Sequence, residues 1–318
     1  MRIVMFTDAN NPTTTALIRA TMRLSDTRDD VTLAGIVTSR PDAFRSSRRR
    51  SVGRWIRRVG VAATNPDARS DPARRTRIDL FRLARARKIP ILVPPAGDPN
   101  DPAFVAQILE ETRPDVALSY YCTRIWRAHL LQAFPQAVNY HDSFLPSYKG
   151  VAATSFSIYY EEQATGFTFH HMTEGIDAGP ILVQDSIAID DHSVFADVAR
   201  RKAAAAVAAL PKVLDLIAAN DPGQPQTDLG SYYSGHDLYA ITRVTRPDLL
   251  TATELRRRIR AFGTVQLAIG GTDWPATRVR TGRPGRRLTF QTADGSYATA
   301  DRIRGVPLRF ARRPTPPR

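Results

Sequence analysis

Strand-like and helix-like segments alternate along most of the first 220 residues of this chain. Short apolar, β-branched runs predict strands, and the stretches between them carry apolar residues at helical spacing. Strands that are apolar throughout are typical of a parallel sheet covered on both faces. The pattern therefore predicts an α/β fold with a doubly wound, mostly parallel sheet, whose ligands bind at the carboxyl ends of the strands. The predicted strands are 3–6, 31–37, 89–93, 116–121, 137–140, 167–172 and 181–189, and the predicted helices are one opened by residues 11–13 and those at 78–86, 104–109, 128–134, 154–160 and 194–219.

The alternation ends at residues 220–225, where two prolines and a glycine stop a long alanine-rich helix. Further on, Thr253 is placed to cap a helix whose apolar stripe holds Leu255, Ile259 and Phe262. Short β-like runs separated by glycine-rich turns follow at 265–269, 276–279 and 288–290. We expect a main domain of residues 1–219 with an insertion at 41–77, a linker of 220–232, and a smaller β-rich C-terminal domain of 233–318 with a frayed end at 313–318.

Charge is distributed unevenly along the chain. The net charge of +14 comes from two basic regions, 45–88 and 239–318, that flank an acidic middle. Such an asymmetry favours an anionic partner such as a phosphate, a nucleotide or a nucleic acid. An arginine-rich solvated surface accounts for the same composition equally well. The first basic region includes most of the insertion at 41–77, and a loop of that length is usually functional or disordered.

Three features narrow the class of protein. No apolar run approaches the ~18 residues of a membrane-spanning helix, and the N-terminal sequence does not resemble a secretory signal. A single cysteine, Cys122, excludes a disulfide framework and fits a reducing compartment. We expect a globular, cytoplasmic protein with no membrane partner.

Two polar segments carry the candidate chemistry. Asn139 and His141 are two residues apart at the end of a predicted strand, so both side chains project from one face. Asp177 lies between Gly175 and Gly179, on a loop that can approach a ligand closely. One strand–helix–strand unit spans the distance from His141 to Asp177, so the two can meet at neighbouring strand ends. Taken singly, His141 could equally be a structural histidine, and Asn139 and Asp177 could equally be ordinary turn residues.

Taken together, the segments resemble the folate-dependent formyltransferases, which include glycinamide ribonucleotide transformylase, methionyl-tRNA formyltransferase and the sugar N-formyltransferases. The resemblance covers roughly the first 200 residues and implies the Rossmann-like formyltransferase fold. Its motifs are Asn139-x-His141-x-Ser143-x-Leu145-Pro146, Gly150, Thr165-Gly166-x-Thr168 and Glu174-Gly175-Ile176-Asp177-x-Gly179.

The resemblance implies that Asn139, His141 and Asp177 are catalytic and that the formyl donor is 10-formyltetrahydrofolate. Formyl transfer proceeds through a tetrahedral oxyanion, to which an amide and a protonated imidazole can donate, while a carboxylate accepts the proton of the attacking amine. A carboxylate beside His141 is also expected to favour the imidazolium form. The residues implied for the folate site are Tyr121, Trp126, Ser143, Leu145, Pro146, His170, Gly175 and Gly179, although Tyr121 and Trp126 are as readily core residues.

Other chemistries have less support. The histidines and Asp177 lack the spacing of known metal motifs, so we expect no metal, and the chain has no nucleotide-binding glycine loop or hydrolase elbow. Cys122 lies outside the motifs, which agrees with a mechanism that needs no covalent intermediate.

The acceptor amine is the open question. The length, the second domain and the basic insertion resemble methionyl-tRNA formyltransferase, whereas Tyr121 and the pair His170-His171 look closer to the sugar enzymes. We favour a small amine, such as a nucleotide-linked amino sugar or a natural-product amine, with tRNA as the alternative. A formyl-folate hydrolase and a non-catalytic folate-binding paralogue remain further alternatives. The residues expected to bind a phosphorylated acceptor are Arg48, Arg49, Arg50 and Lys149.

Overall fold

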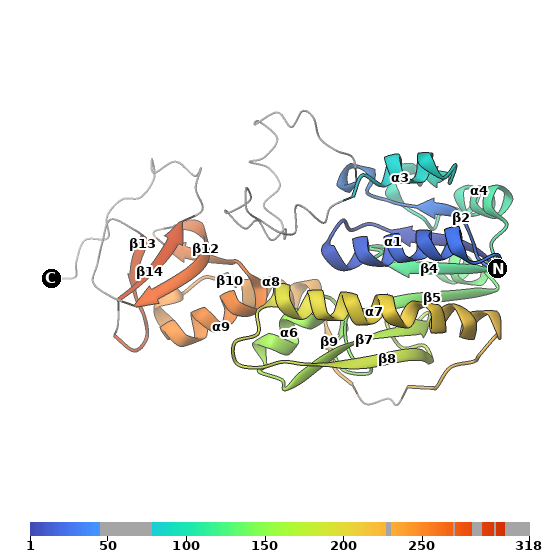
Figure 1. Ribbon diagram of the computed structural model, residues 1–318. Helices are drawn as coiled ribbons and strands as arrows, with labels where there is room; N and C mark the ends of the chain where they lie inside the picture. The colour runs from blue at the N-terminus through green and yellow to red at the C-terminus, as the bar shows by residue number, and fades with distance from the viewer. Residues whose placement is uncertain (45–77, 227–229, 270, 282–287, 296, 303–318) are drawn as a thin grey trace.

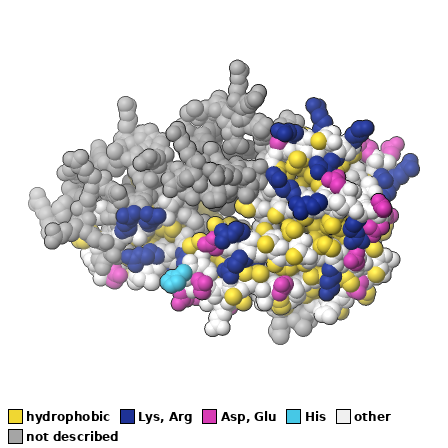
Figure 2. All heavy atoms as spheres, in the orientation of Figure 1, with side chains coloured by type: hydrophobic (Ala, Val, Ile, Leu, Met, Phe, Trp, Pro, Cys, Tyr) yellow, Lys and Arg dark blue, Asp and Glu magenta, His cyan; other side chains and the backbone are white. Residues whose placement is uncertain are grey.

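The computed structural model describes residues 1–44, 78–226, 230–269, 271–281, 288–295 and 297–302. The basic segment with Arg48, Arg49 and Arg50 lies outside the described residues, as does the end of the chain. On the face shown in Figure 2, the Lys and Arg side chains of the described part are interspersed with Asp and Glu.

A seven-stranded sheet forms the centre of the larger part of the molecule, in the order β3-β2-β1-β4-β5-β7-β8. The first five of these strands are parallel, and β7 and β8 continue the sheet in antiparallel fashion. This arrangement confirms the predicted α/β fold with a mostly parallel sheet, and each predicted strand is present. The strands are β1 (Arg2–Thr7), β2 (Thr32–Val37), β3 (Ile91–Leu92), β4 (Val116–Tyr120), β5 (Gln136–His141), β7 (Ala164–His171) and β8 (Ile181–Ala188).

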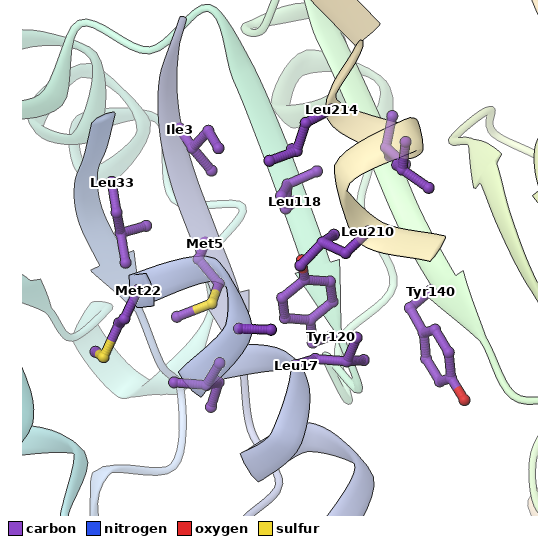
Figure 3. Packing of buried hydrophobic residues seen from close by; sticks show 14 of the residues in the cluster. Ile3, Met5, Leu17, Met22, Leu33, Leu118, Tyr120, Tyr140, Leu210 and Leu214 are labelled. Atoms are coloured by element: carbon purple, nitrogen blue, oxygen red, sulfur yellow. The ribbon is translucent and has the colours of Figure 1, made fainter. Parts of the chain in front are cut away.

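Helices cover both faces of this sheet (Figure 1). In β1, Ile3 and Met5 pack into one hydrophobic cluster with residues of α1 and α7, as Figure 3 shows from close by. Val4 and Phe6 alternate with them and pack on the other face against residues of α4 and α5. The strand is therefore buried on both sides, which explains its uninterrupted apolar sequence. The helices are α1 (Pro12–Thr27), α3 (Leu80–Ala86), α4 (Pro102–Thr112), α5 (Ala128–Gln132), α6 (Ala153–Tyr159) and α7 (Phe195–Ala218), with short 3-10 turns at Pro41–Ala43 and Pro95–Gly97.

A second sheet, in the order β10-β11-β12-β14-β13, lies at the other end of the molecule. It has a hydrophobic cluster of its own, which includes Leu255, Val265 and Leu267. Its elements are α8 (Gly235–Thr242), β10 (Arg243–Val244), a 3-10 turn at Pro247–Leu249, α9 (Ala252–Phe262), β11 (Val265–Ile269), β12 (Thr272–Thr281), β13 (Leu288–Gln291) and β14 (Tyr297–Arg302).

The sequence interpretation of this second part was wrong in two details. The helix α9 is capped by Thr251, whose hydroxyl accepts from the backbone N–H of Glu254, and Thr253 lies inside the first turn. Both threonines precede the same apolar stripe, so the periodicity did not separate them. In addition, α8 and β14 were not predicted, because α8 is a short helix with no buried residue and β14 lacks a continuous apolar run.

The predicted linker, residues 220–232, leads into a segment that contacts a loop of the larger sheet before the chain enters the second sheet. Within it, β9 (Tyr232–Tyr233) pairs in parallel with β6 (Lys149–Gly150), which follows β5. At Gly150 the backbone has φ +93°, and an added Cβ would lie 2.2 Å from the Tyr233 carbonyl oxygen. Only glycine allows the two segments to approach this closely.

Candidate active site

The candidate site is built around the carboxyl end of β5. Asn139 and His141 occupy alternate positions near the end of this strand, so their side chains share one face of the sheet. The neighbouring strand β7 runs antiparallel, and its register places His170 directly opposite Asn139. Two sequence motifs that are 31 residues apart are thereby joined by cross-strand pairing.

Asp177 enters the site from the loop between β7 and β8. Its Oδ2 lies 3.3 Å from His141 Nδ1, and its Oδ1 lies 3.5 Å from both Asn139 Nδ2 and His170 Nε2. The backbone N–H of Gly150 donates to Oδ2 over 2.8 Å. The structure thus brings together Asn139, His141 and Asp177, as the spacing of the motifs suggested, and adds His170 as a fourth member.

The conformation of the Asp177 loop is fixed by its neighbours. Asp177 itself has φ +49°, a left-handed conformation that aspartate tolerates better than most residues. At Gly179 an added Cβ would lie 1.9 Å from the His171 carbonyl oxygen, so no larger residue fits there. The amide of Gln226 donates to the carbonyl oxygens of Asp177 and Gly179, each over 2.8 Å. Gln226 comes from the linker, and nothing in the sequence marked it for this role.

The hydrogen-bond partners define which ring nitrogens carry protons. His141 Nε2 lies 2.9 Å from the Tyr148 carbonyl oxygen, which can only accept, so this nitrogen is the protonated one. His170 Nδ1 likewise lies 2.8 Å from the His171 carbonyl oxygen. His170 Nε2 faces both Asn139 Nδ2, at 3.3 Å, and Asp177 Oδ1, at 3.5 Å.

Burial and charge act in opposite directions on the pKa values of the pair. Burial alone would raise the pKa of Asp177, but His141, His170 and the Gly150 N–H outweigh it and lower that pKa to about 2. Burial lowers the pKa of His141, and this effect outweighs the opposing influence of Asp177. Asp177 thus favours the imidazolium form of His141, as expected, but burial opposes that form more strongly. For Asp177 the balance is reversed, since its charged and hydrogen-bonding neighbours outweigh burial and keep the carboxylate ionised.

The site is nearly closed to solvent. His141 is 6% exposed, His170 is 2% exposed, and the Asp177 side chain is 11% exposed. Beside them, Val151 and Ile176 are exposed apolar residues that adjoin Gly150 and Asp177 in sequence. An ionised carboxylate thus lies in a poorly solvated position, where its interactions with a substrate are strong.

The loop after β5 holds Ser143, Leu145 and Pro146, which the resemblance implies for the folate site. Ser143 Oγ donates to the Ser147 carbonyl oxygen over 2.6 Å, and the Leu145 N–H donates to Thr168 Oγ1 over 3.1 Å. The peptide bond between Leu145 and Pro146 is cis. These contacts shape the loop that ends in Lys149 and Gly150.

Tyr121 and Trp126, both suggested for the folate site, lie in different surroundings. Trp126 is 5% exposed and packs against Phe6, with 4.3 Å between ring centroids, so its ring belongs to the core. Tyr121 packs against Tyr140, which is on the face of the sheet opposite to Asn139 and His141. Neither ring lines the cluster around Asp177.

Two cavities in the structure lie away from the cluster of Asn139, His141 and Asp177. One of about 520 Å³ lies beside α3 and β3, and another of about 370 Å³ lies near the start of β5. Within the described residues, no group of three or more His, Cys, Asp or Glu side chains is arranged to hold a metal ion. In that same part of the chain, no helix has the length and apolar character needed to cross a membrane.

Comparison with known proteins gives matches over most of the chain. A model of the formyl transferase family matches residues 1–214. GDP-perosamine N-formyltransferase of Brucella melitensis biotype 1 is 29% identical over 184 residues, which are 58% of this chain and 67% of that protein.

Two solved structures show the shared fold. A sugar N-formyltransferase from Shewanella sp. FDAARGOS_354 has a TM-score of 0.60 at 18% identity, and the match covers 86% of this chain and 95% of that one. An N-formyltransferase from Helicobacter canadensis, solved with folinic acid and dTDP-3-aminofucose, has a TM-score of 0.58 at 17% identity. That match covers 95% of this chain and 99% of the other.

Proposed function

The chain belongs to the formyl transferase family, and we propose that it transfers a formyl group from 10-formyltetrahydrofolate to the amine of a nucleotide-linked amino sugar. The observation that carries this proposal is the cluster of Asn139, His141 and Asp177 at the carboxyl end of β5. In open α/β sheets, ligands bind at this edge.

Asn139 is the oxyanion donor in this proposal. The amine nitrogen forms a bond to the formyl carbon, and negative charge develops on the formyl oxygen. The two hydrogen bonds from Asn139 Nδ2, to His170 and Asp177, are 3.3 and 3.5 Å long and therefore weak. Exchanging such a long contact for a short hydrogen bond to the developing oxyanion is favourable, because hydrogen bonds to ionised acceptors are strong when their geometry is good.

His141 and Asp177 act as a pair in handling the proton. The attacking amine must lose one proton, and the departing folate nitrogen must gain one. Asp177 is ionised throughout the physiological range, so it can accept the proton. With a pKa of about 2 it holds a proton only briefly, which favours passing it on to the departing nitrogen directly or through a water. His141, whose Nδ1 faces the carboxylate, can take this same proton from Asp177 and hold it as an imidazolium beside the oxyanion until it passes to the departing nitrogen.

The acceptor is inferred from the relatives and from the site's surroundings. The GDP-perosamine enzyme and the protein solved with dTDP-3-aminofucose both carry names that refer to amino sugars linked to nucleotides. Val151 and Ile176 give apolar surface next to Asp177, which suits the apolar faces of a sugar or pterin ring. Lys149 adjoins the loop that contacts Asp177, and its charge suits the phosphates of such a substrate.

The test is a screen of acceptors with 10-formyltetrahydrofolate as donor, in which release of tetrahydrofolate is measured. We expect turnover with at least one nucleotide-linked amino sugar, and formylation of its amine by mass spectrometry. Turnover with charged methionyl-tRNA only would replace the acceptor in this proposal. Folate turnover that is independent of any amine would indicate a hydrolase, and folate binding without turnover would indicate a binding protein.

A further inference from the structure

A fully buried lysine lies on the opposite side of β5 from the candidate active site. Lys202 belongs to α7 and is 0% exposed. It occupies the apolar stripe of the helix, one turn after Val198 and one turn before Ala206, both of which are also buried. Lysine is almost never fully buried unless it is paired, so the contacts of this side chain need an explanation.

Lys202 Nζ contacts three oxygen atoms. It donates to the Asp142 carbonyl oxygen over 2.8 Å and lies 3.1 Å from Asp142 Oδ1. It also donates to Thr154 Oγ1, whose own hydrogen is donated to Asp142 Oδ2 over 2.5 Å. All three N–H bonds of the ammonium group therefore have acceptors, and both oxygens of the carboxylate are used.

These contacts close a loop. Asp142 directly follows His141, and Thr154 is the second residue of α6, so Lys202 binds both ends of the segment from 142 to 154. Within that segment lie the Tyr148 carbonyl oxygen, which accepts from His141, and the Gly150 N–H, which donates to Asp177. The backbone partners of the histidine and of the aspartate thus both belong to the loop that Lys202 closes.

We propose that Lys202 is a positioning residue, which joins the two ends of the 142–154 loop and thereby fixes the backbone groups that orient His141 and Asp177. The consequence for transfer activity rests on the function proposed above, whereas the consequence for His141 does not.

The experiment compares Thr154→Val with Thr21→Val. Thr154→Val keeps the shape of the side chain but removes the contact at one end of the loop, and it leaves the pairing of Lys202 with Asp142 intact. Thr21→Val is the matched control, since Thr21 is also fully buried and its hydroxyl contacts Tyr120 at 3.1 Å and the Leu17 carbonyl oxygen at 3.0 Å, neither of which belongs to the 142–154 loop. Lys202→Met, which removes the ammonium group altogether, is the stronger variant where it folds.

Two quantities are measured for each variant. The first is the apparent pKa of His141, followed by NMR of its side chain against pH, because the groups that face this ring are Asp177, His170 and the Tyr148 carbonyl, with Asp142 nearby. The second is kcat and KM for 10-formyltetrahydrofolate with the acceptor found in the screen. Misplacing catalytic groups by about 1 Å can cost about 10²-fold in rate.

For Thr154→Val we expect kcat to fall about tenfold with KM within about twofold, and the His141 titration to move by at least about 0.5 pH unit. Thr21→Val should change neither quantity. A Thr154→Val protein with the kcat and the His141 titration of the Thr21→Val protein overturns the proposal. If the wild type shows no transfer at all, the function proposed above fails, and the His141 titration alone decides the role of Lys202.

Discussion

Two polar clusters flank the end of β5, one on each face of the sheet. On one face, Asn139, His141 and Asp177 lie 3.3–3.5 Å apart with His170. On the other, Asp142 contacts Lys202, Thr154 and Tyr140 at distances from 2.5 to 3.2 Å. Successive side chains along a strand point to opposite faces of the sheet, so the consecutive residues His141 and Asp142 lie in different clusters.

The difference in distance corresponds to a difference in what the clusters can do. Short, mutually saturated contacts leave no donor or acceptor for a ligand, and they hold the backbone in one arrangement. Long contacts are weak and can be exchanged for contacts to a substrate in which charge develops. We therefore expect substitutions in the Asp177 cluster to act mainly on activity, and substitutions in the Asp142 cluster to reduce stability together with a smaller loss of activity through the 142–154 loop.

The largest expected effect is that of Asp177→Asn. The amide keeps an oxygen for the Gly150 N–H but cannot accept the amine's proton, so turnover should fall by about 10³–10⁴-fold. The affinity for folate should change little, and the melting temperature should fall only by what the loss of about 2 kcal/mol of carboxylate stabilisation predicts. Both are measured on the same purified sample as turnover. Activity close to that of the wild type would show that Asp177 is only a turn residue.

His141→Asn comes next. Removing one group that stabilises the oxyanion typically costs about 10²–10³-fold in turnover, and we expect a loss of that size with folate binding retained. Steady-state kinetics and a folate-binding titration check this. A folded variant with nearly normal turnover would remove His141 from the proposed mechanism.

Asp142→Asn tests the other cluster by the same chemical change as at Asp177. Breaking a buried ion pair costs about 3–5 kcal/mol, and we expect the lower end, about 3 kcal/mol, because the amide oxygen can still accept from Lys202. Urea unfolding measures the change. Asp185→Asn, at an exposed position on β8, is the control and should stay within about 0.5 kcal/mol of the wild type. Equal stability of the two variants would mean that Asp142 and Lys202 contribute no net stability.

The smallest effect is the contribution of Asp177 to stability in acid. Its pKa is lowered from 3.8 to about 2 by folding, so the folded state releases this proton more readily than the unfolded state. The resulting stabilisation of about 2 kcal/mol is complete above pH 4 and is lost as the pH falls through about 2. Since the pKa of His141 is also lowered, a second loss of stability begins as the pH falls below 6.5.

Urea unfolding of the wild type and Asp177→Asn at several pH values between 7 and 2 separates the two contributions. The variant should show a decline between pH 4 and 2 that is smaller by about 2 kcal/mol, because other carboxylates with lowered pKa values, such as Glu254, titrate in both proteins. A parallel decline in both proteins would mean that Asp177 has the same pKa in the folded and unfolded states.

The sequence predicted the first cluster because its members belong to motifs. Asn139 and His141 end an apolar strand, and Asp177 lies between glycines, so both pattern and resemblance pointed to them. The predicted sheet was right for a related reason, since long apolar strands and helices with one apolar face leave strong periodic signals.

The sequence indicates the cluster of Asp142 and Lys202 only in part. The spacing of Val198, Lys202, Ala206 and Leu210 places the lysine on the apolar face of α7, which marks it as unusual. Its partner Asp142 is 60 residues away, and no local pattern links the two. The lowered pKa of His141 was missed because it depends on how deeply the ring is buried, which one neighbouring carboxylate does not reveal.

The pairing of β6 with β9 has a consequence for how this chain can be shortened or recombined. The break in the sequence pattern at residues 220–225 suggests a convenient point at which to exchange the C-terminal part for another. Yet Gln226 holds the Asp177 loop, and Tyr233 lies against Gly150, so the residues just after that break support the candidate active site. A chimera joined after Tyr233 keeps these contacts, whereas one joined at residue 219 discards them. The composition changes after residue 219, but the contacts that support the candidate site continue to residue 233, fourteen residues later. An exchange of the C-terminal part should therefore be made after residue 233.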